Sequence, residues 1–242
     1  MMKQLIIGKK AILNAIANKT LIQATVSNKD SFFFQKVKIF LPTVKIVNDK
    51  KYYDKMTNNC PNHQLAIGYM NDKNVTNNFA EAIKKIAKKN NGIVVILDRI
   101  YDPRNFGAII RTCECFGVDC IIYKKDQQCP ITSTVNKTSA GAVGNINLIK
   151  VTNLNIIIDK LKKEGFWIYC SCLDKNALKC HHMKFDKKIA LIIGNEEKGV
   201  SQLLKKNSDF KIWIETTGKT QSLNVANATA ILLYAIKTNK NN

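Results

Sequence analysis

The sequence contains no apolar run long enough to cross a membrane and has no secretory signal at its start. The longest apolar runs are residues 93–97 and 230–236, far below the ~20 residues that a membrane-spanning helix needs. Residues 1–8 are too short and too polar for a signal peptide, because Lys3 and Gln4 interrupt them. We therefore expect a cytoplasmic protein that does not contact membranes.

The motifs of common nucleotide sites are also missing. No G-x-G-x-x-G follows any expected strand, so a dinucleotide-binding fold has no support. Gly194 and Gly199 have the spacing of a phosphate-binding loop, but Val200 replaces the lysine of that motif. Glu196 and Glu197 lie inside the same loop and would repel a triphosphate. Nucleotide hydrolysis is therefore not expected, and a cofactor that is not polyanionic fits the loop better.

The eight cysteines form no zinc-type pattern. Four of them make two C-x-C pairs, at positions 113 and 115 and at positions 170 and 172, whereas zinc ribbons use C-x-x-C. Cys172, Cys180 and the histidines at 181 and 182 match no common ligand spacing either. We read the cysteines as reduced thiols and expect no metal.

Acidic residues are scarce relative to lysine. The chain has 38 Lys and Arg against 18 Asp and Glu, a net charge of +20. Sixteen lysines against five acids lie in residues 1–91, and 22 basic against 13 acidic residues lie in 92–242. Such a surplus favours a nucleic acid or another anionic partner. An alternative source of part of this basic surplus is a genome of biased base composition, which produces proteins rich in Lys, Asn and Ile.

Arginine is rare, and its three copies are clustered at Arg99, Arg104 and Arg111. A guanidinium binds phosphate with two parallel hydrogen bonds, which lysine does not do. The cluster therefore marks a candidate site. For Arg111 the alternative is an i,i+3 surface pair with Glu114.

The order of expected elements divides the chain into residues 1–72, a small α/β domain; 73–91, a linker with a helix; and 92–242, an α/β domain. In the first domain we expect a helix at 8–18, strands at 24–26, 37–40 and 65–69, and loops carrying Tyr52, Tyr53, His63 and Gln64. From residue 93 on, the chain alternates between strands at 93–97, 120–123, 166–170, 189–193 and 212–214 and helical segments at 107–116, 134–142, 154–164 and 223–237. This alternation predicts a mostly parallel sheet with helices on both faces.

Ligands of such sheets bind beyond the carboxyl ends of the strands, here the loops after Leu97, Ile193 and Ile214. Asn105 and Ser222 are candidate N-caps of the helices that follow two of these loops. A helical wheel puts Ala108, Thr112, Cys115 and Phe116 on the buried stripe, with Arg111 at its edge.

Each of the three loops carries a motif: Asn105-Phe-Gly107-Ala-Ile-Ile-Arg111-Thr112, Gly194-Asn-Glu196-Glu-Lys-Gly199 and Gly218-Lys-Thr-Gln-Ser222-Leu223-Asn224-Val225. In this order and spacing they resemble the motifs of the SpoU-type RNA ribose 2′-O-methyltransferases of the SPOUT superfamily. Ser139-Ala-Gly-Ala142 resembles a further segment of that family. Residues 1–70 resemble, more loosely, its N-terminal RNA-binding domain through Ile7, Gly8, Ala11, His63 and Gln64.

The resemblance implies a C-terminal domain with a deep trefoil knot, a homodimer around it, and S-adenosylmethionine as cofactor. It implies that backbone groups of Gly194, Ile214 and Leu223 hold the cofactor, with Gly199 and Gly218 in the same loops. It also implies that Arg111 is the central catalytic residue, surrounded by Asn105, Glu196, Ser222 and Asn224. Because a guanidinium is practically never deprotonated, phosphate anchoring is physically easier for Arg111 than a role as general base.

Three positions depart from the pattern. Glu215 stands where the family usually has Pro, Ala226 where it usually has Ser, and Leu65 where Gly commonly follows His-Gln.

The layout, a small N-terminal domain without terminal helical extensions, is similar to that of enzymes that modify a guanosine ribose in large-subunit (23S-type) rRNA. We therefore expect rRNA as the partner. Methylation of a tRNA guanosine and resistance-type methylation of rRNA remain alternatives within the enzyme class. A non-catalytic RNA-binding assembly factor is the alternative outside it.

Overall fold

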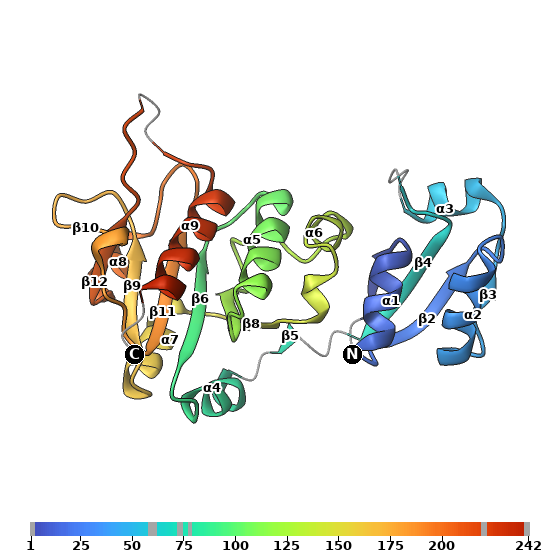
Figure 1. Cartoon of the computed structure of the whole chain (residues 1–242), viewed down its shortest axis with the longest axis horizontal. Coiled ribbons are helices and arrows are strands. Elements are labelled where there is room, and N and C mark those ends of the chain that lie inside the picture. Colours follow the sequence, from blue (N-terminus) through green and yellow to red (C-terminus); the bar gives the residue numbers. More distant parts are fainter. Residues whose placement is uncertain (1–2, 58–61, 72–74, 77–78, 219–221, 240–242) are drawn as a thin grey trace.

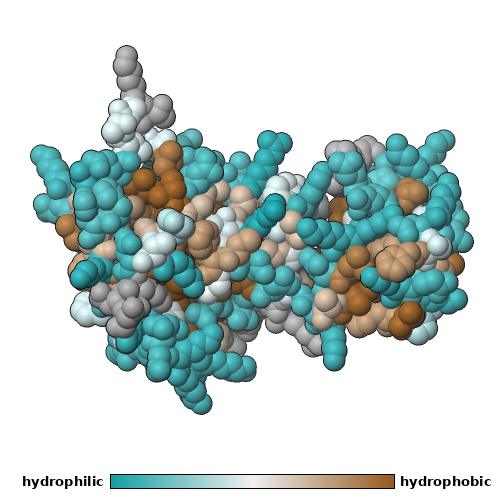
Figure 2. All heavy atoms as spheres, viewed as in Figure 1, coloured by the Kyte–Doolittle hydropathy of each residue, from teal (hydrophilic) through white to brown (hydrophobic). Residues whose placement is uncertain are grey.

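The computed structural model describes residues 3–57, 62–71, 75–76, 79–218 and 222–239. Figure 1 shows two α/β bodies side by side, each built around its own sheet. Hydrophilic side chains cover much of both bodies in the face drawn in Figure 2, in agreement with lysines that are spread over the whole chain.

The N-terminal body has a four-stranded sheet in the order β1-β4-β2-β3. Its strands are β1 (Lys3–Ile7), β2 (Leu21–Val26), β3 (Lys45–Ile46) and β4 (Ala66–Asn71), and its helices are α1 (Lys9–Ala17), α2 (Ser31–Phe40) and α3 (Lys50–Met56). Strand β4 runs antiparallel to β1 and β2, whereas β3 runs parallel to β2. Ile12, Val26 and Val37 lie at the centre of the core and are inaccessible to solvent.

Two expectations for this body were wrong. Residues 37–40, expected as a strand, are the end of α2. Phe33 and Val37 are one helical turn apart and bury one face of that helix, and the Asp30 side chain caps its start by accepting from Phe33 N at 3.0 Å. Tyr52 and Tyr53, expected in a loop, lie in α3; Tyr53 is fully buried, and its hydroxyl donates to Val47 O at 2.7 Å.

The C-terminal body has an eight-stranded sheet in the order β10-β12-β9-β11-β6-β7-β8-β5, and every pair of neighbours is parallel. The strands are β5 (Val75–Thr76), β6 (Gly92–Asp98), β7 (Cys120–Lys124), β8 (Asn147–Val151), β9 (Trp167–Ser171), β10 (Leu178–Lys179), β11 (Lys188–Gly194) and β12 (Phe210–Trp213). The α-helices are α4 (Phe79–Ala87), α5 (Pro103–Cys115), α6 (Ser133–Thr138), α7 (Leu154–Lys163), α8 (Gln202–Asn207) and α9 (Val225–Thr238), and the 3₁₀ turns are η1 (Ala142–Gly144) and η2 (Cys180–His182).

Both faces of this sheet are covered. Val95 and Leu97 of β6 pack with residues of α5, α6 and α9, whereas the alternating Val94 and Ile96 pack with residues of α4, α7 and α8. The expected mostly parallel sheet with helices on both faces is therefore confirmed. The sequence could indicate it because strands that are buried on both faces appear in the sequence as continuous apolar runs. The trefoil knot stays a prediction.

The expected linker is partly an edge strand. Val75 and Thr76 form β5 and pair with Leu148 and Ile149 of β8. Residues 72–74 and 77–78 of the linker lie outside the described residues.

Side-chain amides join the two bodies. Contacts include Asn14 Nδ2 to Ala140 O at 3.4 Å, Asn18 Nδ2 to Gly144 O at 2.9 Å and Asn136 Nδ2 to Leu5 O at 3.5 Å. In the part of the chain that the structure describes, the buried apolar cluster of the N-terminal body shares no residue with those of the C-terminal body. Each body therefore has a core of its own.

Helix α5 begins earlier than expected, and this changes which side chains it buries. Asp102 is its N-cap and accepts from Arg104 N at 2.7 Å, so the expected cap Asn105 instead lies in the first turn. Phe106, Ile109, Ile110 and Cys113 form the buried stripe. Cys115, expected on that stripe, is exposed. No helix in the described residues is long and apolar enough to span a membrane.

Candidate active site

The second and third motif loops line one pocket at the carboxyl ends of β11 and β12. The pocket has a volume of ≈ 350 Å³, within the range of small-molecule sites. Six of the expected catalytic and cofactor-binding residues line it: Gly194, Glu196, Gly199, Ile214, Ser222 and Leu223. Of the expected cofactor residues, Gly218 alone does not line it; it is exposed with no heavy atom near the position of a Cβ.

Asn195 shapes the second loop, and sequence reasoning missed it. Its Oδ1 accepts from Glu197 N at 3.0 Å and from Lys198 N at 2.9 Å, which closes a tight turn. The turn folds back so closely that a Cβ on Gly194 would lie 2.2 Å from Val200 N and 2.3 Å from the carbonyl carbon of Gly199. Position 194 therefore requires glycine, because the loop at 195–200 comes too close to the end of β11 to leave room for a side chain.

The first loop is tied to the second through Arg99. Its guanidinium donates to both carboxylate oxygens of the neighbouring Asp98 at 3.1 Å and to Gly199 O at 3.2 Å. Asp98 is 3% exposed and also accepts from Ser201 N at 2.8 Å. One of the three arginines is thus used to hold the loops together and is not free to bind phosphate.

A chain of side-chain hydrogen bonds links one residue from each motif. Asn224 Nδ2 donates to Asn105 Oδ1 at 3.0 Å, and Asn105 Nδ2 donates to Glu196 Oε1 at 2.7 Å. These contacts bridge 119 and 91 residues of sequence. Glu196 Oε2 also accepts from Asn195 at 3.3 Å, so both oxygens of the carboxylate face amide donors. This series of hydrogen bonds therefore fixes the orientation of the Asn105 and Asn224 amides and the position of the Glu196 carboxylate at the pocket.

Asn224 also begins the last helix, a role expected for Ser222. Its Oδ1 accepts from Ala226 N at 2.9 Å and from Asn227 N at 3.4 Å, so Asn224 is the N-cap of α9. The expectation for Ser222 was wrong, because the helix starts at Val225. Since Oδ1 is used as the cap, Nδ2 is the atom left to reach Asn105. Ser222 stays exposed at the pocket.

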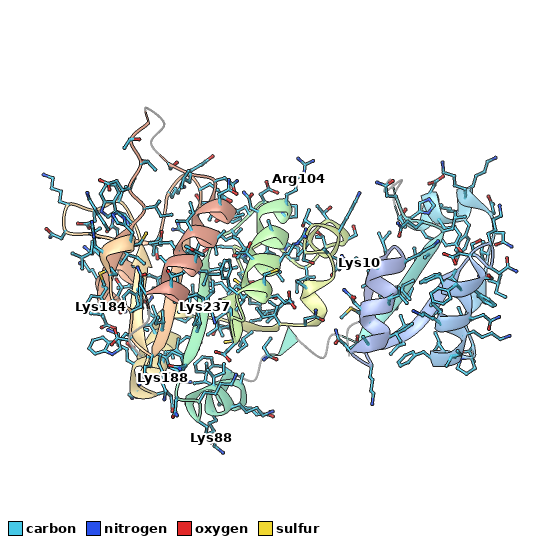
Figure 3. The ribbon with its side chains drawn as sticks, in the orientation of Figure 1. Lys10, Lys88, Arg104, Lys184, Lys188 and Lys237 are labelled. Atoms are coloured by element: carbon cyan, nitrogen blue, oxygen red, sulfur yellow. The ribbon has the colours of Figure 1, made fainter. Side chains whose placement is uncertain are left out.

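Arg111 is not part of this hydrogen-bonded chain. It lies six residues after Asn105 on α5, which is about 9 Å along the helix axis, and its side chain is exposed. No ion pair of the described residues joins it to Glu114, whose Oε1 accepts from Asn145 Nδ2 at 3.4 Å. Arg104 is also exposed and points outward from the start of α5 (Figure 3). Both guanidinium groups are thus placed to meet a partner.

A further wall of the pocket comes from the end of β9, which sequence reasoning passed over. Ser171, Cys172 and Leu173 line the pocket together with Lys205 of α8. A hydrogen bond from Cys170 lowers the pKa of the Cys172 thiol, aided by Lys205, whereas the same contact raises the pKa of Cys170. The strand at 166–170 was expected. Since ligands bind beyond the carboxyl ends of such strands, the residues after it could have been included among the candidate loops.

The pocket residues fit S-adenosylmethionine. Ile193, Ile214, Leu223 and Val225 offer an apolar surface for a purine ring, and the carboxylates of the second loop suit a cationic sulfonium. Gly194 keeps the adjoining backbone free of side-chain bulk. In the described residues no three His, Cys, Asp or Glu side chains are grouped to hold a metal ion.

Comparisons with known proteins show what this chain is similar to. The model of the SpoU rRNA Methylase family matches residues 92–234. A tRNA/rRNA methyltransferase of Borreliella burgdorferi is 45% identical over 174 residues, which cover 71% of this chain and 75% of that protein. One from Mycoplasma pneumoniae is 36% identical over 96% of both chains. The fold matches an AdoMet-bound rRNA methyltransferase from Sinorhizobium meliloti with a TM-score of 0.82 at 21% identity, covering 98% of this chain and 87% of that one.

Proposed function

Since the chain belongs to the SpoU rRNA methylase family, we propose that it transfers the methyl group of S-adenosylmethionine to a ribose 2′-hydroxyl of RNA. The observation that carries the proposal is the hydrogen-bonded chain from Asn224 through Asn105 to Glu196, which joins all three motif loops beside the pocket. A protein that only bound RNA would have no need to fix these three side chains next to a small-molecule pocket.

The residues have separate roles in this proposal. Bound S-adenosylmethionine supplies a methyl group already activated by its sulfonium. Backbone around Gly194, Ile214 and Leu223 holds the cofactor, and the Asn224–Asn105–Glu196 chain keeps the mouth of the pocket rigid. Arg111, exposed on α5, binds the phosphate beside the target ribose and stabilises the negative charge that develops on the 2′-oxygen. Ser222 lies at the pocket edge, where its hydroxyl can contact the ribose.

We propose a guanosine of large-subunit rRNA as the substrate. Purified protein and labelled cofactor should methylate unmodified 23S-type rRNA, and mass spectrometry of the nucleosides should find 2′-O-methylguanosine. Binding should weaken steeply with salt, because lysine contacts to phosphates release counterions. Methylation of bulk tRNA with none of rRNA would overturn the substrate while keeping the reaction. If the protein binds RNA but does not bind S-adenosylhomocysteine, it is a non-catalytic RNA-binding protein instead.

The N-terminal body is proposed to bind RNA, and its helix α2 offers suitable side chains. Phe32 is 71% exposed, and Lys36 Nζ lies 4.4 Å from the centre of its ring. An exposed aromatic ring beside a lysine suits an unpaired base and its phosphate. Two copies of the chain are proposed to pair through the C-terminal body, where Ile231 and Tyr234 of α9 are 41% and 61% exposed.

A truncated protein that begins at Phe79 tests the RNA-binding role of the N-terminal body and the pairing of two copies through the C-terminal body. Because the two bodies have separate cores, it should fold, keep its affinity for S-adenosylhomocysteine, and sediment as a dimer. Its affinity for rRNA should fall at least about tenfold, since the loss of twelve mostly exposed lysines and Phe32 removes phosphate contacts. Unchanged rRNA affinity would show that the N-terminal body has another function, and a monomeric mass would refute the proposed interface.

A further inference from the structure

The segment 214–217 separates two cavities. Ile214 and Thr216 line the pocket proposed for the cofactor, whereas Glu215 and Thr217 line a second cavity of ≈ 510 Å³, which Ile214 also borders. The segment follows β12 and leads to the third motif loop. In Figure 1, β10 and β12 form one edge of the large sheet. A shift of this segment would therefore change the shape of the cofactor pocket directly.

On its outer side the segment is held by charge. Glu215 Oε1 accepts from Lys179 Nζ at 2.5 Å, and Glu215 Oε2 lies 3.8 Å from His181 Nε2. The Lys179 contact lowers the pKa of the Glu215 carboxyl. Both partners are fixed by the fold. Lys179 is in β10, in register with Trp213 at the end of β12, and the carbonyl of His181 accepts from Asn239 Nδ2 at 3.2 Å.

The start of this segment is anchored by Ile214, which packs against the core of the C-terminal body. Beyond it, the backbone of residues 215–218 makes no backbone-to-backbone hydrogen bond with another residue that the structure describes. The family pattern usually has proline at position 215, whose ring restricts the backbone by itself. Glu215 has no such restraint, so among the described residues its contacts with Lys179 and His181 hold the segment that follows Ile214.

We propose that Glu215 is a positioning residue, whose ion pair with Lys179 holds segment 214–217 as the outer wall of the cofactor pocket. This rests on the proposed function, which assigns that pocket to S-adenosylmethionine. The ion pair acts through the backbone of Ile214 and Thr216 and touches no cofactor atom. It therefore governs cofactor affinity and leaves the methyl-transfer step unaffected once the pocket is filled.

The test measures S-adenosylhomocysteine binding to the full chain by calorimetry at pH 8. For an ion pair of this exposure, Glu215→Gln and Lys179→Glu should each raise the Kd about three- to fivefold. The KM for S-adenosylmethionine should rise by the same factor at unchanged kcat. The double variant Glu215→Lys with Lys179→Glu exchanges the two charges and should restore the affinity. If the single substitutions acted by damaging the fold, combining them would not restore it. Glu81→Gln, which breaks the exposed pair with Lys85 on α4, is the matched control and should change nothing.

Two results would overturn the proposal: unchanged affinity in Glu215→Gln, or no recovery in the double variant. Ala228→Phe separates this failure from failure of the pocket assignment, because Ala228 lines the pocket and a phenyl ring would fill it. If Ala228→Phe abolishes binding while Glu215→Gln does not, only the positioning role is wrong. If a folded Ala228→Phe binds as the wild type does, the cofactor lies elsewhere and both assignments fail.

Discussion

Arg111→Lys should lower the rate of methyl transfer at least about a hundredfold, the scale seen when one charge-stabilising donor is removed from an active site. The substitution keeps the positive charge but loses the planar fork that holds a phosphate with two hydrogen bonds. Arg111 is exposed and does not line the pocket. The fold and the affinity for S-adenosylhomocysteine should therefore be unchanged.

Single-turnover methylation with saturating cofactor and RNA measures the effect, and calorimetry measures the cofactor affinity. Arg104→Lys is the matched control, since Arg104 is an exposed arginine on the same helix that points outward at its start (Figure 3). We expect it to retain the wild-type rate within a few-fold, with a modest loss of RNA affinity. If Arg111→Lys turns over like the wild type, Arg111 is not the catalytic arginine.

The sequence predicts the central strands of the large sheet well, because a strand buried on both faces must be apolar throughout. All seven residues of β6 are buried, and its range was expected within one residue at each end. The two-residue strands β5 and β10 could not be found this way. Their place at the sheet edges is set by pairing with β8 and β12, which local sequence does not encode.

Helix α2 shows how an apolar stretch is misread. Residues 37–40 alternate in a way that suits a strand, but Phe33 and Val37 share one helical face and pack into the core. The deciding signal was Asp30, whose carboxylate caps the helix. Short apolar runs remain ambiguous between helix and strand unless the caps are taken into account.

For the candidate site, the motifs identified the right loops but not the bonds between them. Asn105 and Ser222 were both expected as helix caps, whereas Asp102 and Asn224 are the caps in the structure. Moving each helix start changes what the nearby polar side chains can do: Asn105 becomes free to reach Glu196. Contacts across about ninety residues depend on where the strands end in space, and spacing along the chain does not report that.

The glycines of the motif loops give the sharpest contrast between positions that look alike in sequence. Gly194 and Gly218 were both expected at the cofactor. A Cβ at Gly194 would meet backbone atoms of Gly199 and Val200 at 2.2–2.7 Å, whereas a Cβ at Gly218 would meet nothing within 4 Å. Backbone atoms cannot rotate away as a side chain can, so a methyl group at position 194 must push the turn outward.

Gly194→Ala should therefore reduce the affinity for S-adenosylhomocysteine at least about tenfold, since forcing a methyl group into a packed site costs about 1–3 kcal/mol. The melting temperature should also fall. Binding to rRNA through the N-terminal body should persist, because that body is built on a separate core. Gly218→Ala is the matched control and should leave cofactor affinity and stability unchanged. Equal affinities in calorimetry for Gly194→Ala and the wild type would mean that the turn at 195–199 does not form the cofactor wall. A loss in Gly218→Ala as large as that in Gly194→Ala would instead mean that the third motif loop closes over the cofactor.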